Sequence, residues 1–345
     1  MLGRYQGLAR ERSTRKSAVG IIANPASGKD VRRLVGAASV VDNNEKVNVV
    51  RRILVGLAAT GVGAVRYMPE HYDIVGRALD GAGALVEAGP LEMGFAGRPA
   101  DTLVATRHLV GLGVGAIVVL GGDGTSRLVA SRAGATPIVA VSTGTNNALP
   151  SWIDGTAAGL AAGLVASGQL DLEVCAPRVK RLDVCVEGAG EALSDLALVD
   201  VALARDRFVG ARALWDPDAL SELILTRAEP GAIGLSAIGA HLEPLERDDP
   251  AGLWLRLGPG GLTVRAPIVP GLVRDVAVRE RRRIRPGEPI ELTPTGGVIA
   301  FDGEKEHELG RSARVTVTLS LEGPRVVEIR RTLELAARAG LFVGR

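Results

Sequence analysis

Cysteine and histidine are both scarce in this chain of 345 residues, which contains two cysteines and four histidines. Cys175 and Cys185 fit neither a metal-binding nor a redox spacing. The histidines are scattered and show no zinc-ligand pattern. The sequence therefore gives no sign of a zinc module or a disulfide framework, and we expect a reduced, cytoplasmic protein.

Long apolar runs are absent as well. No stretch approaches the roughly 18 to 20 residues needed to cross a bilayer, so we expect no integral membrane association. Residues 1–17 are charged and lack the apolar core of a signal peptide, which predicts a flexible tail. The net charge is only +2, and acidic and basic residues are interspersed along the chain, which argues against a nucleic-acid-binding surface.

Aromatic residues make up only 3% of the chain, whereas hydrophobic residues make up 46%. A large core of Ala, Val, Leu and Ile is therefore expected. The length favours two domains. Strand and helix patterns alternate through residues 18–150, which predicts an α/β domain with a parallel sheet. Residues 151–329 become rich in short strands with Gly and Pro turns, which predicts a β-rich domain. The helix expected in residues 330–345 returns to the first domain.

Local residue patterns predict individual helices and strands in both parts of the chain. An Asp-Asn-Asn-Glu sequence at residues 42–45 can cap a helix whose apolar positions run from Val47 to Leu57 and which stops at Gly61. In the β-rich part, nine strand candidates are separated by turn residues. They include Leu196 to Leu203, Leu253 to Leu257 and Leu262 to Ala266.

The most informative stretch lies at residues 116–132, where a buried-strand pattern runs into GGDGT at residues 121–125 and then into a helical pattern. This geometry directs backbone N–H groups and a helix N-terminus onto an anion. We expect the glycines to adopt positive φ and to let phosphate oxygens approach the backbone. The carboxylate of Asp123 would repel a phosphate. We therefore expect it to interact with a metal ion, with a sugar hydroxyl or with a proton that must be removed. Alone, the pentapeptide is equally compatible with a plain tight turn.

A similar turn, NPASGK at residues 24–29, follows the strand pattern AVGIIA. It is not a Walker A loop, because Ala23 replaces the first glycine and Asp30 replaces the magnesium-binding Ser or Thr. Two interpretations stay open. The backbone N–H groups and Lys29 contact a phosphate, or the turn only starts a helix.

A third turn, STGTNN at residues 142–147, follows the strand pattern PIVAV. Ligands of parallel sheets lie at the carboxyl ends of the strands, so we expect the three turns to share one edge and one nucleotide. Their Thr and Asn side chains supply hydroxyl and amide groups for ribose and phosphate oxygens. No GxGxxG follows any strand, which excludes the usual dinucleotide fingerprint.

The β-rich part contains the motif FDGE at residues 301–304, which can present Asp302 and Glu304 to a cleft. Taken alone, this motif favours a surface hairpin turn. The basic run RERRRIR at residues 279–285 is predicted to be a solvated strand or turn, with a phosphate clamp as the alternative. GLSAIG at residues 234–239 has one residue too many for a GxSxG nucleophile elbow.

NPASGK, GGDGT, STGTNN and FDGE, in this order, resemble the superfamily of NAD kinases, diacylglycerol kinases and sphingosine-type lipid kinases. DNNEKVN at residues 42–48 and the GTNNALP ending are similar to the NAD-kinase-like family associated with acetoin catabolism. The resemblance covers the chain from about Ala18 to Phe342. It implies a Rossmann-like or phosphofructokinase-like parallel sheet, a β-rich C-terminal domain, and an active site in the cleft between them.

The resemblance also implies roles for particular residues. Asp123, Asp302 and Glu304 are the catalytic candidates, because NAD kinases tie the GGDG aspartate to the acceptor hydroxyl and lipid kinases use the DGE carboxylates. The three turns contribute the candidate nucleotide-binding residues Asn24, Gly28, Lys29, Gly121, Gly122, Gly124, Thr125, Thr143, Gly144, Thr145, Asn146 and Asn147. The NTDNE-like stretch of typical NAD kinases is not recognisable here, and STGTNN is closer to the lipid-kinase pattern.

The leading hypothesis is a kinase that transfers a phosphoryl group from ATP to a hydroxyl of NAD, with Mg²⁺ bridging the phosphates and a carboxylate. The alternatives are a lipid or small-alcohol kinase and a nucleotide-binding regulator without catalysis. By analogy with the superfamily, a homodimer or homotetramer is expected.

Overall fold

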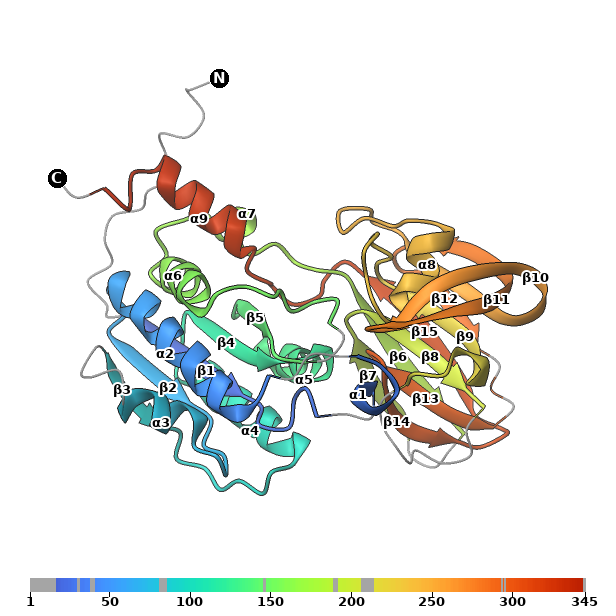
Figure 1. Ribbon diagram of the computed structural model, residues 1–345, viewed down its shortest axis with the longest axis horizontal. Coiled ribbons are helices and arrows are strands. Elements are labelled where there is room, and N and C mark those ends of the chain that lie inside the picture. The colour runs from blue at the N-terminus through green and yellow to red at the C-terminus, as the bar shows by residue number, and fades with distance from the viewer. Residues whose placement is uncertain are drawn as a thin grey trace.

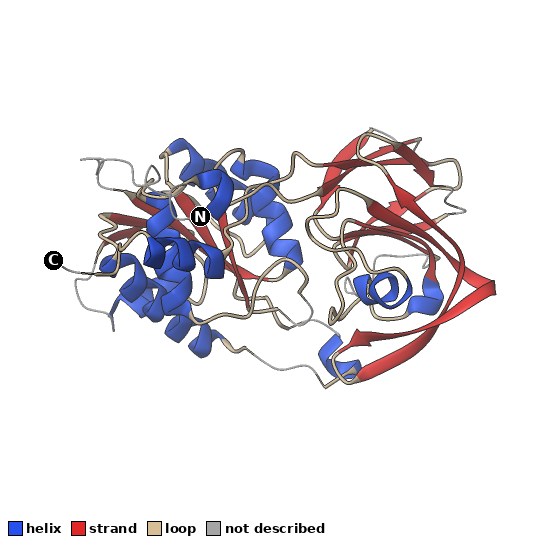
Figure 2. Ribbon diagram, turned by 90° about the horizontal axis from the view of Figure 1, so that it is seen from above, coloured by secondary structure: helices blue, strands red, loops and turns tan. Residues whose placement is uncertain are grey.

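The computed structural model describes residues 17–29, 32–37, 41–80, 86–144, 147–188, 192–205, 214–292, 294 and 296–343. Thr145, Asn146 and nearly all of the expected N-terminal tail lie outside these residues. The chain forms an α/β half and a β-rich half that lie next to each other (Figure 1). Helices surround the sheet of the first half, whereas strands dominate the second (Figure 2).

Five parallel strands form the sheet of the first half, in the order β3-β2-β1-β4-β5. They are β1 (Ala18–Ala23), β2 (Ala64–Tyr67), β3 (Glu87–Pro90), β4 (Ala116–Gly121) and β5 (Ile138–Ser142). All residues of β4 are buried, as its unbroken apolar run predicts. The predicted parallel α/β sheet is therefore confirmed. The strand order reverses between β1 and β4, which is where ligands bind in such sheets.

Helices cover both faces of this sheet. One face carries α2 (Asn43–Ala59), α3 (Ile74–Asp80) and α6 (Gly155–Ala166), and the other carries α4 (Pro99–Gly111) and α5 (Asp123–Ala133). Of two further helices, α9 (Ile329–Arg338) packs beside α6, and α7 (Leu172–Cys175) packs beside α9. The C-terminal helix thus returns to the α/β half.

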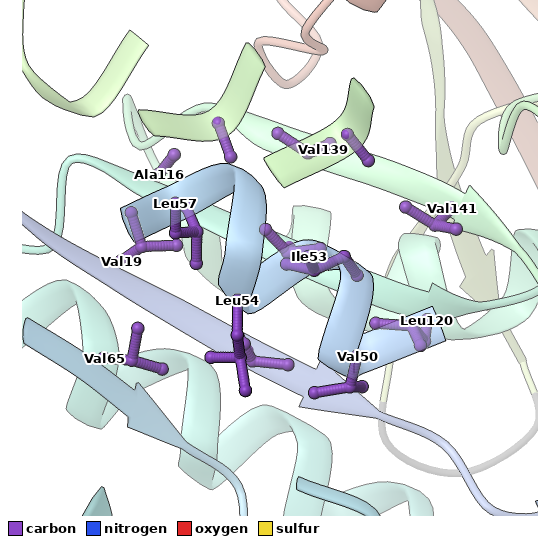
Figure 3. Packing of buried hydrophobic residues seen from close by; sticks show 14 of the residues in the cluster. Val19, Val50, Ile53, Leu54, Leu57, Val65, Ala116, Leu120, Val139 and Val141 are labelled. Carbon is purple, nitrogen blue, oxygen red and sulfur yellow. The ribbon is translucent and has the colours of Figure 1, made fainter. Parts of the chain in front are cut away.

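Helix α2 begins where its capping residue predicts, because the side chain of Asp42 accepts a hydrogen bond of 2.8 Å from the backbone N–H of Glu45. Its apolar side chains, among them Ile53 and Leu57, lie against the sheet (Figure 3). Helix α6 approaches α2 closely, since a Cβ on Gly159 would lie 2.2 Å from the carbonyl oxygen of Ile53. Small residues in α6 therefore permit this contact.

Two antiparallel sheets build the second half, with strand orders β11-β10-β9-β8-β13-β14 and β12-β15-β6-β7. The strands are β6 (Arg181–Glu187), β7 (Leu193–Ala197), β8 (Asp200–Ala204), β9 (Leu220–Leu225), β10 (Gly252–Val269), β11 (Leu272–Ile284), β12 (Pro289–Leu292), β13 (Gly297–Phe301), β14 (Glu304–Leu309) and β15 (Arg314–Ser320). Apolar residues of both sheets, including Phe301 and Val317, form one cluster. The helix α8 (Ser236–Leu242) packs against β10, and two short turns, α1 (Arg32–Val35) and η1 (Pro217–Ala219), complete the elements.

Some predicted strand boundaries are wrong. The single strand expected at residues 196–203 is two strands, because Leu198 and Val199 leave the ladder and donate their N–H groups to Asp302. The two strands expected at residues 253–257 and 262–266 belong to the one strand β10. No helix in the described part of the chain is long and apolar enough to cross a membrane.

Candidate functional site

The three glycine-containing turns meet at the carboxyl ends of β1, β4 and β5. The side-chain amide of Asn24 donates a hydrogen bond of 2.8 Å to the hydroxyl of Thr125. The hydroxyl groups of Ser27 and Thr143 lie 2.8 Å apart and share a hydrogen bond. The turn after β1 thus contacts the turns after β4 and β5, at the point where the strand order reverses.

Glycines make these contacts possible in two different ways. Gly28 has a φ of 73°, and a Cβ there would lie 2.7 Å from the carbonyl oxygen of Thr143. None of the GGDGT glycines adopts positive φ, so that expectation is wrong. They instead allow close approach, since a Cβ on Gly124 would lie 3.1 Å from the carboxylate of Glu304. A Cβ on Gly144 would lie 2.6 Å from the amide oxygen of Asn147.

Lys46 of α2 holds the first turn from behind, a role that the sequence analysis missed. Its ammonium donates to the carbonyl oxygens of Asn24 at 2.9 Å and Ser27 at 3.0 Å, and to the side chain of Asn43 at 3.2 Å. The side chain is fully buried, and this burial, helped by the charge of Lys29, lowers its pKa to about 8. The sequence feature that could have revealed this role is the position of Lys46 within the apolar stripe of α2.

Lys29 itself points elsewhere. Its ammonium lies 4.9 Å from the centre of the Tyr72 ring, and the residue is exposed. A phosphate contact of Lys29 therefore stays a prediction.

The carboxylate of Asp123 connects the second turn to the segment after the third. It accepts hydrogen bonds from the backbone N–H groups of Ala148 at 2.9 Å and Leu149 at 2.8 Å. Asp123 is buried and, together with Asp302, lines a small cavity of about 20 Å³. Asp123 thereby ties the start of α5, where a helix N-terminus favours anions, to residues 148 and 149.

Asp302 plays a comparable part in the second half. One of its carboxylate oxygens accepts hydrogen bonds from Leu198 at 2.9 Å, Val199 at 2.8 Å and Asp200 at 3.2 Å. Its φ is 50°, a left-handed conformation that Asp tolerates better than most residues. Burial raises the pKa of Asp302 to about 7, against the charge of Arg127 and together with that of Asp123.

Glu304 lines a larger pocket of about 190 Å³ between the two halves. Asn24, Gly124 and Thr125 of the α/β half line the same pocket. Among the residues described, the Glu304 side chain has no hydrogen bond or ion pair, and it is half-buried. The structure therefore places Glu304 in this pocket, whereas Asp123 and Asp302 line the smaller cavity beside it.

Arg127 joins the two halves across this pocket, and the sequence analysis did not identify it. Its guanidinium lies 2.9 Å from the carboxylate of Asp195 and 2.7 Å from that of Glu306. Burial disfavours its charge, but Asp195, Asp302 and Glu306 raise its pKa above the usual value. The partners lie 68 and 179 residues away, so local patterns cannot reveal them.

A magnesium ion would find few protein ligands here. Within the ranges given above, no group of three or more His, Cys, Asp or Glu side chains is placed to hold a metal ion. Mg²⁺ is usually held by one or two carboxylates together with substrate phosphates. Glu304 fits an ion of that kind, which would arrive with a nucleotide.

The arginines of the basic run at residues 279–285 are exposed, as predicted, and lie on β11 or directly after it. Arg281 lies 3.4 Å from Glu243, while Arg282 and Arg283 pair with Glu288 and Asp249. None of these arginines lines the pocket between the halves. The alternative of a phosphate clamp therefore finds no support in this geometry.

The comparisons with known proteins divide the chain in a similar way. Residues 19–169 match the family model of the ATP-NAD kinase N-terminal domain, and residues 180–322 match that of the acetoin catabolism protein X C-terminal domain. The structure of yeast NADH kinase in complex with NADH is similar at a TM-score of 0.48 and 14% identity, covering 95% of this chain and 89% of that chain.

A curated relative, acetoin catabolism protein X of Cupriavidus necator, is 39% identical over 335 residues. The match covers 94% of this chain and 93% of the relative. The first half is thus a domain of the NAD kinase type, and the whole chain belongs to the acetoin catabolism protein X family.

Proposed function

We propose that this protein transfers the terminal phosphoryl group of ATP to a hydroxyl of NAD and so produces NADP. The observation that carries the proposal is the position of Glu304, a carboxylate without a partner among the described residues, opposite the start of α5. Phosphoryl transfer needs donors for the phosphates and a carboxylate for the attacking hydroxyl, and this pocket holds both.

The turns after β1, β4 and β5 would bind the phosphates through backbone N–H groups and through the hydroxyl of Thr125. Gly28, Thr143, Gly144 and Asn147 would shape the rest of the nucleotide site. Thr145 and Asn146, which lie outside the described residues, keep the same proposed role.

Glu304 would orient the acceptor hydroxyl and accept its proton. Asp123 and Asp302 would act as positioning residues, because their oxygens already accept backbone N–H groups. When Mg²⁺ is bound, it neutralises charge on the transferred phosphoryl group.

The pocket of about 190 Å³ is smaller than the sites that usually hold whole cofactors, which span roughly 300 to 1,000 Å³. Binding of ATP and NAD would therefore require the halves to part. The first half, residues 18–150 with 330–345, also includes α6, which packs on its sheet, so the half that would part from it consists of the strands β6 to β15 within residues 151–329. The ion pairs of Arg127 with Asp195 and Glu306 would hold the closed arrangement.

The name of the Cupriavidus necator relative concerns acetoin catabolism. We extend this association to the present chain and propose a cytoplasmic protein that supplies NADP to that catabolism. A homodimer or homotetramer is proposed on the analogy of the superfamily.

The test is single-turnover transfer from ATP labelled at its terminal phosphate, with Mg²⁺ and with NAD, NADH, diacylglycerol or a sphingoid base as acceptor. We expect label on NAD and a loss of about 10²- to 10⁴-fold in rate in Glu304→Gln. The matched control is Glu308→Gln, on the exposed face of the same strand, with an unchanged rate. Label on a lipid would replace the NAD proposal by a lipid kinase. Nucleotide binding without any transfer would identify a regulator.

A further inference from the structure

A second pocket, of about 710 Å³, lies away from the three turns, beside the C-terminal helix α9. Its lining comes from the segment after β5, from α7, from α9 and from Arg247 of the β-rich half. Its volume falls within the range of small-molecule sites. None of its lining residues belongs to the pocket that contains Glu304.

The charged residues of this pocket are mainly arginines. Four arginines and two glutamates line it, namely Arg247, Arg330, Arg331, Arg338, Glu328 and Glu334. Arg247 lies 3.2 Å from Glu328, and Arg338 pairs with Glu334. Within the described chain, Arg330 and Arg331 have no ion pair or hydrogen bond of their side chains. The pocket therefore has two uncompensated positive charges, which favours an anionic ligand.

Apart from Ser151, the remaining lining is apolar. Ile153, Ile329 and Leu335 lie in the wall, so the pocket offers a hydrophobic surface next to the guanidinium groups. Inorganic phosphate would fill only a small part of the volume and would leave this surface wet. An organic phosphate with an apolar body uses both features, because its phosphate pairs with arginine and its body covers the apolar wall.

The charge of Arg247 acts from this pocket towards the candidate active site. Burial first, and then the nearby charge of Arg247, lower the pKa of the buried Arg227. Arg227 donates a hydrogen bond of 3.4 Å to the carbonyl oxygen of Ala148. The backbone N–H of the same Ala148 donates a hydrogen bond to Asp123. An anion beside Arg247 would reduce its repulsion of Arg227 and so strengthen the contact with Ala148.

We propose that this arginine-lined pocket is a second binding site, which takes a small organic phosphate and passes its charge through Arg247 and Arg227 to the Ala148 segment. The inference does not depend on the proposed kinase activity, because binding is measured without turnover.

The test uses phenyl phosphate as the probe and Trp152 as the reporter. Trp152 is 73% exposed and lies between Ser151 and Ile153, which both line the pocket. We expect saturable quenching of tryptophan fluorescence by phenyl phosphate and none by phenol at the same concentration. The double variant Arg330→Gln, Arg331→Gln should bind about tenfold to hundredfold more weakly. The matched double variant Arg107→Gln, Arg132→Gln, at exposed arginines elsewhere, should bind like the unmodified chain.

Hydrogen exchange of the full chain locates the probe. Protection is expected in residues 328–338 and, through Arg227, in residues 147–150. Undiminished binding by the Arg330→Gln, Arg331→Gln variant, or protection confined to residues 24–29 and 121–128, would overturn the proposed site. Protection of α9 without any change in residues 147–150 would overturn the connection to the active site.

Discussion

Each half of the molecule contains an Asp-Gly turn, and the two turns differ in what they leave open. Asp123-Gly124 begins helix α5, whereas Asp302-Gly303 joins the strands β13 and β14. Both carboxylates accept hydrogen bonds from backbone N–H groups of a neighbouring segment. Only the first turn has a helix N-terminus beside it, and only the second has an acidic side chain, that of Glu304, directed into the pocket.

The residues that hold the site in place thus differ from the residue that is available to a ligand. An aspartate whose oxygens already accept several N–H groups fixes two segments relative to each other. A carboxylate one residue beyond the same glycine is available for a hydroxyl or a cation. The presence of Asp-Gly in a motif therefore does not show which carboxylate is available to a ligand, whereas the hydrogen bonds of each carboxylate do.

Removing each aspartate should affect stability unequally. Asp302→Ala leaves three buried N–H groups without an acceptor and places alanine at positive φ, so we expect a loss of about 4 kcal/mol in the free energy of unfolding. Asp123→Ala removes the acceptor of two N–H groups, and the expected loss in the free energy of unfolding is about 2 kcal/mol. Urea denaturation of both variants measures this difference, and equal losses would contradict it.

The stability of the protein should depend on pH through Asp302, whose pKa is raised by burial. The pKa of Asp302 is raised from 3.8 to about 7, so the folded state binds more protons than the unfolded state between these values. Its contribution to the free energy of unfolding therefore falls as the pH rises from about 4 through about 7, and it levels off about one pH unit higher. Asp302→Asn should remove this fall, which is on the order of 3 kcal/mol.

Denaturation curves of Asp302→Asn and the unmodified chain at pH values between 4.5 and 7.5 test this prediction. The control is Asp275→Asn. The hydrogen bond to Arg265 lowers the pKa of Asp275, so its contribution is lost as the pH falls, which is the opposite sign. Parallel curves for Asp302→Asn and the unmodified chain would show that Asp302 does not titrate in this range.

The sequence predicts those features whose causes are local. The strand β4, the turn at residues 121–125 and the helix α5 follow each other directly, so apolar run, glycines and helical spacing reveal them. The break between β7 and β8 could not be predicted, because its cause, Asp302, lies about 100 residues further along the chain. The same holds for the ion pair between Arg127 and Glu306. A lysine in a helix normally extends to solvent, which explains why Lys46 was missed.

Each half of the molecule contains one buried lysine whose ammonium group donates hydrogen bonds to backbone carbonyl oxygens. Lys46 donates to carbonyl oxygens of the first turn, and Lys180 donates to those of Asp249 and Ala251 in the β-rich half. Burial is the main cause that lowers both pKa values to about 8. Replacement by methionine keeps most of the length of the side chain and removes the donors in either place.

We expect both methionine variants to lose about 1 kcal/mol of stability, because the lost hydrogen bonds are partly offset by the relief of a buried charge. Only Lys46→Met loosens the turn at residues 24–29, so only this variant should raise the KM for ATP, by several-fold, with a smaller change in kcat. Steady-state kinetics of the two variants measure the split. An equal rise in KM for Lys180→Met would mean that general destabilisation, and not the turn, governs nucleotide binding.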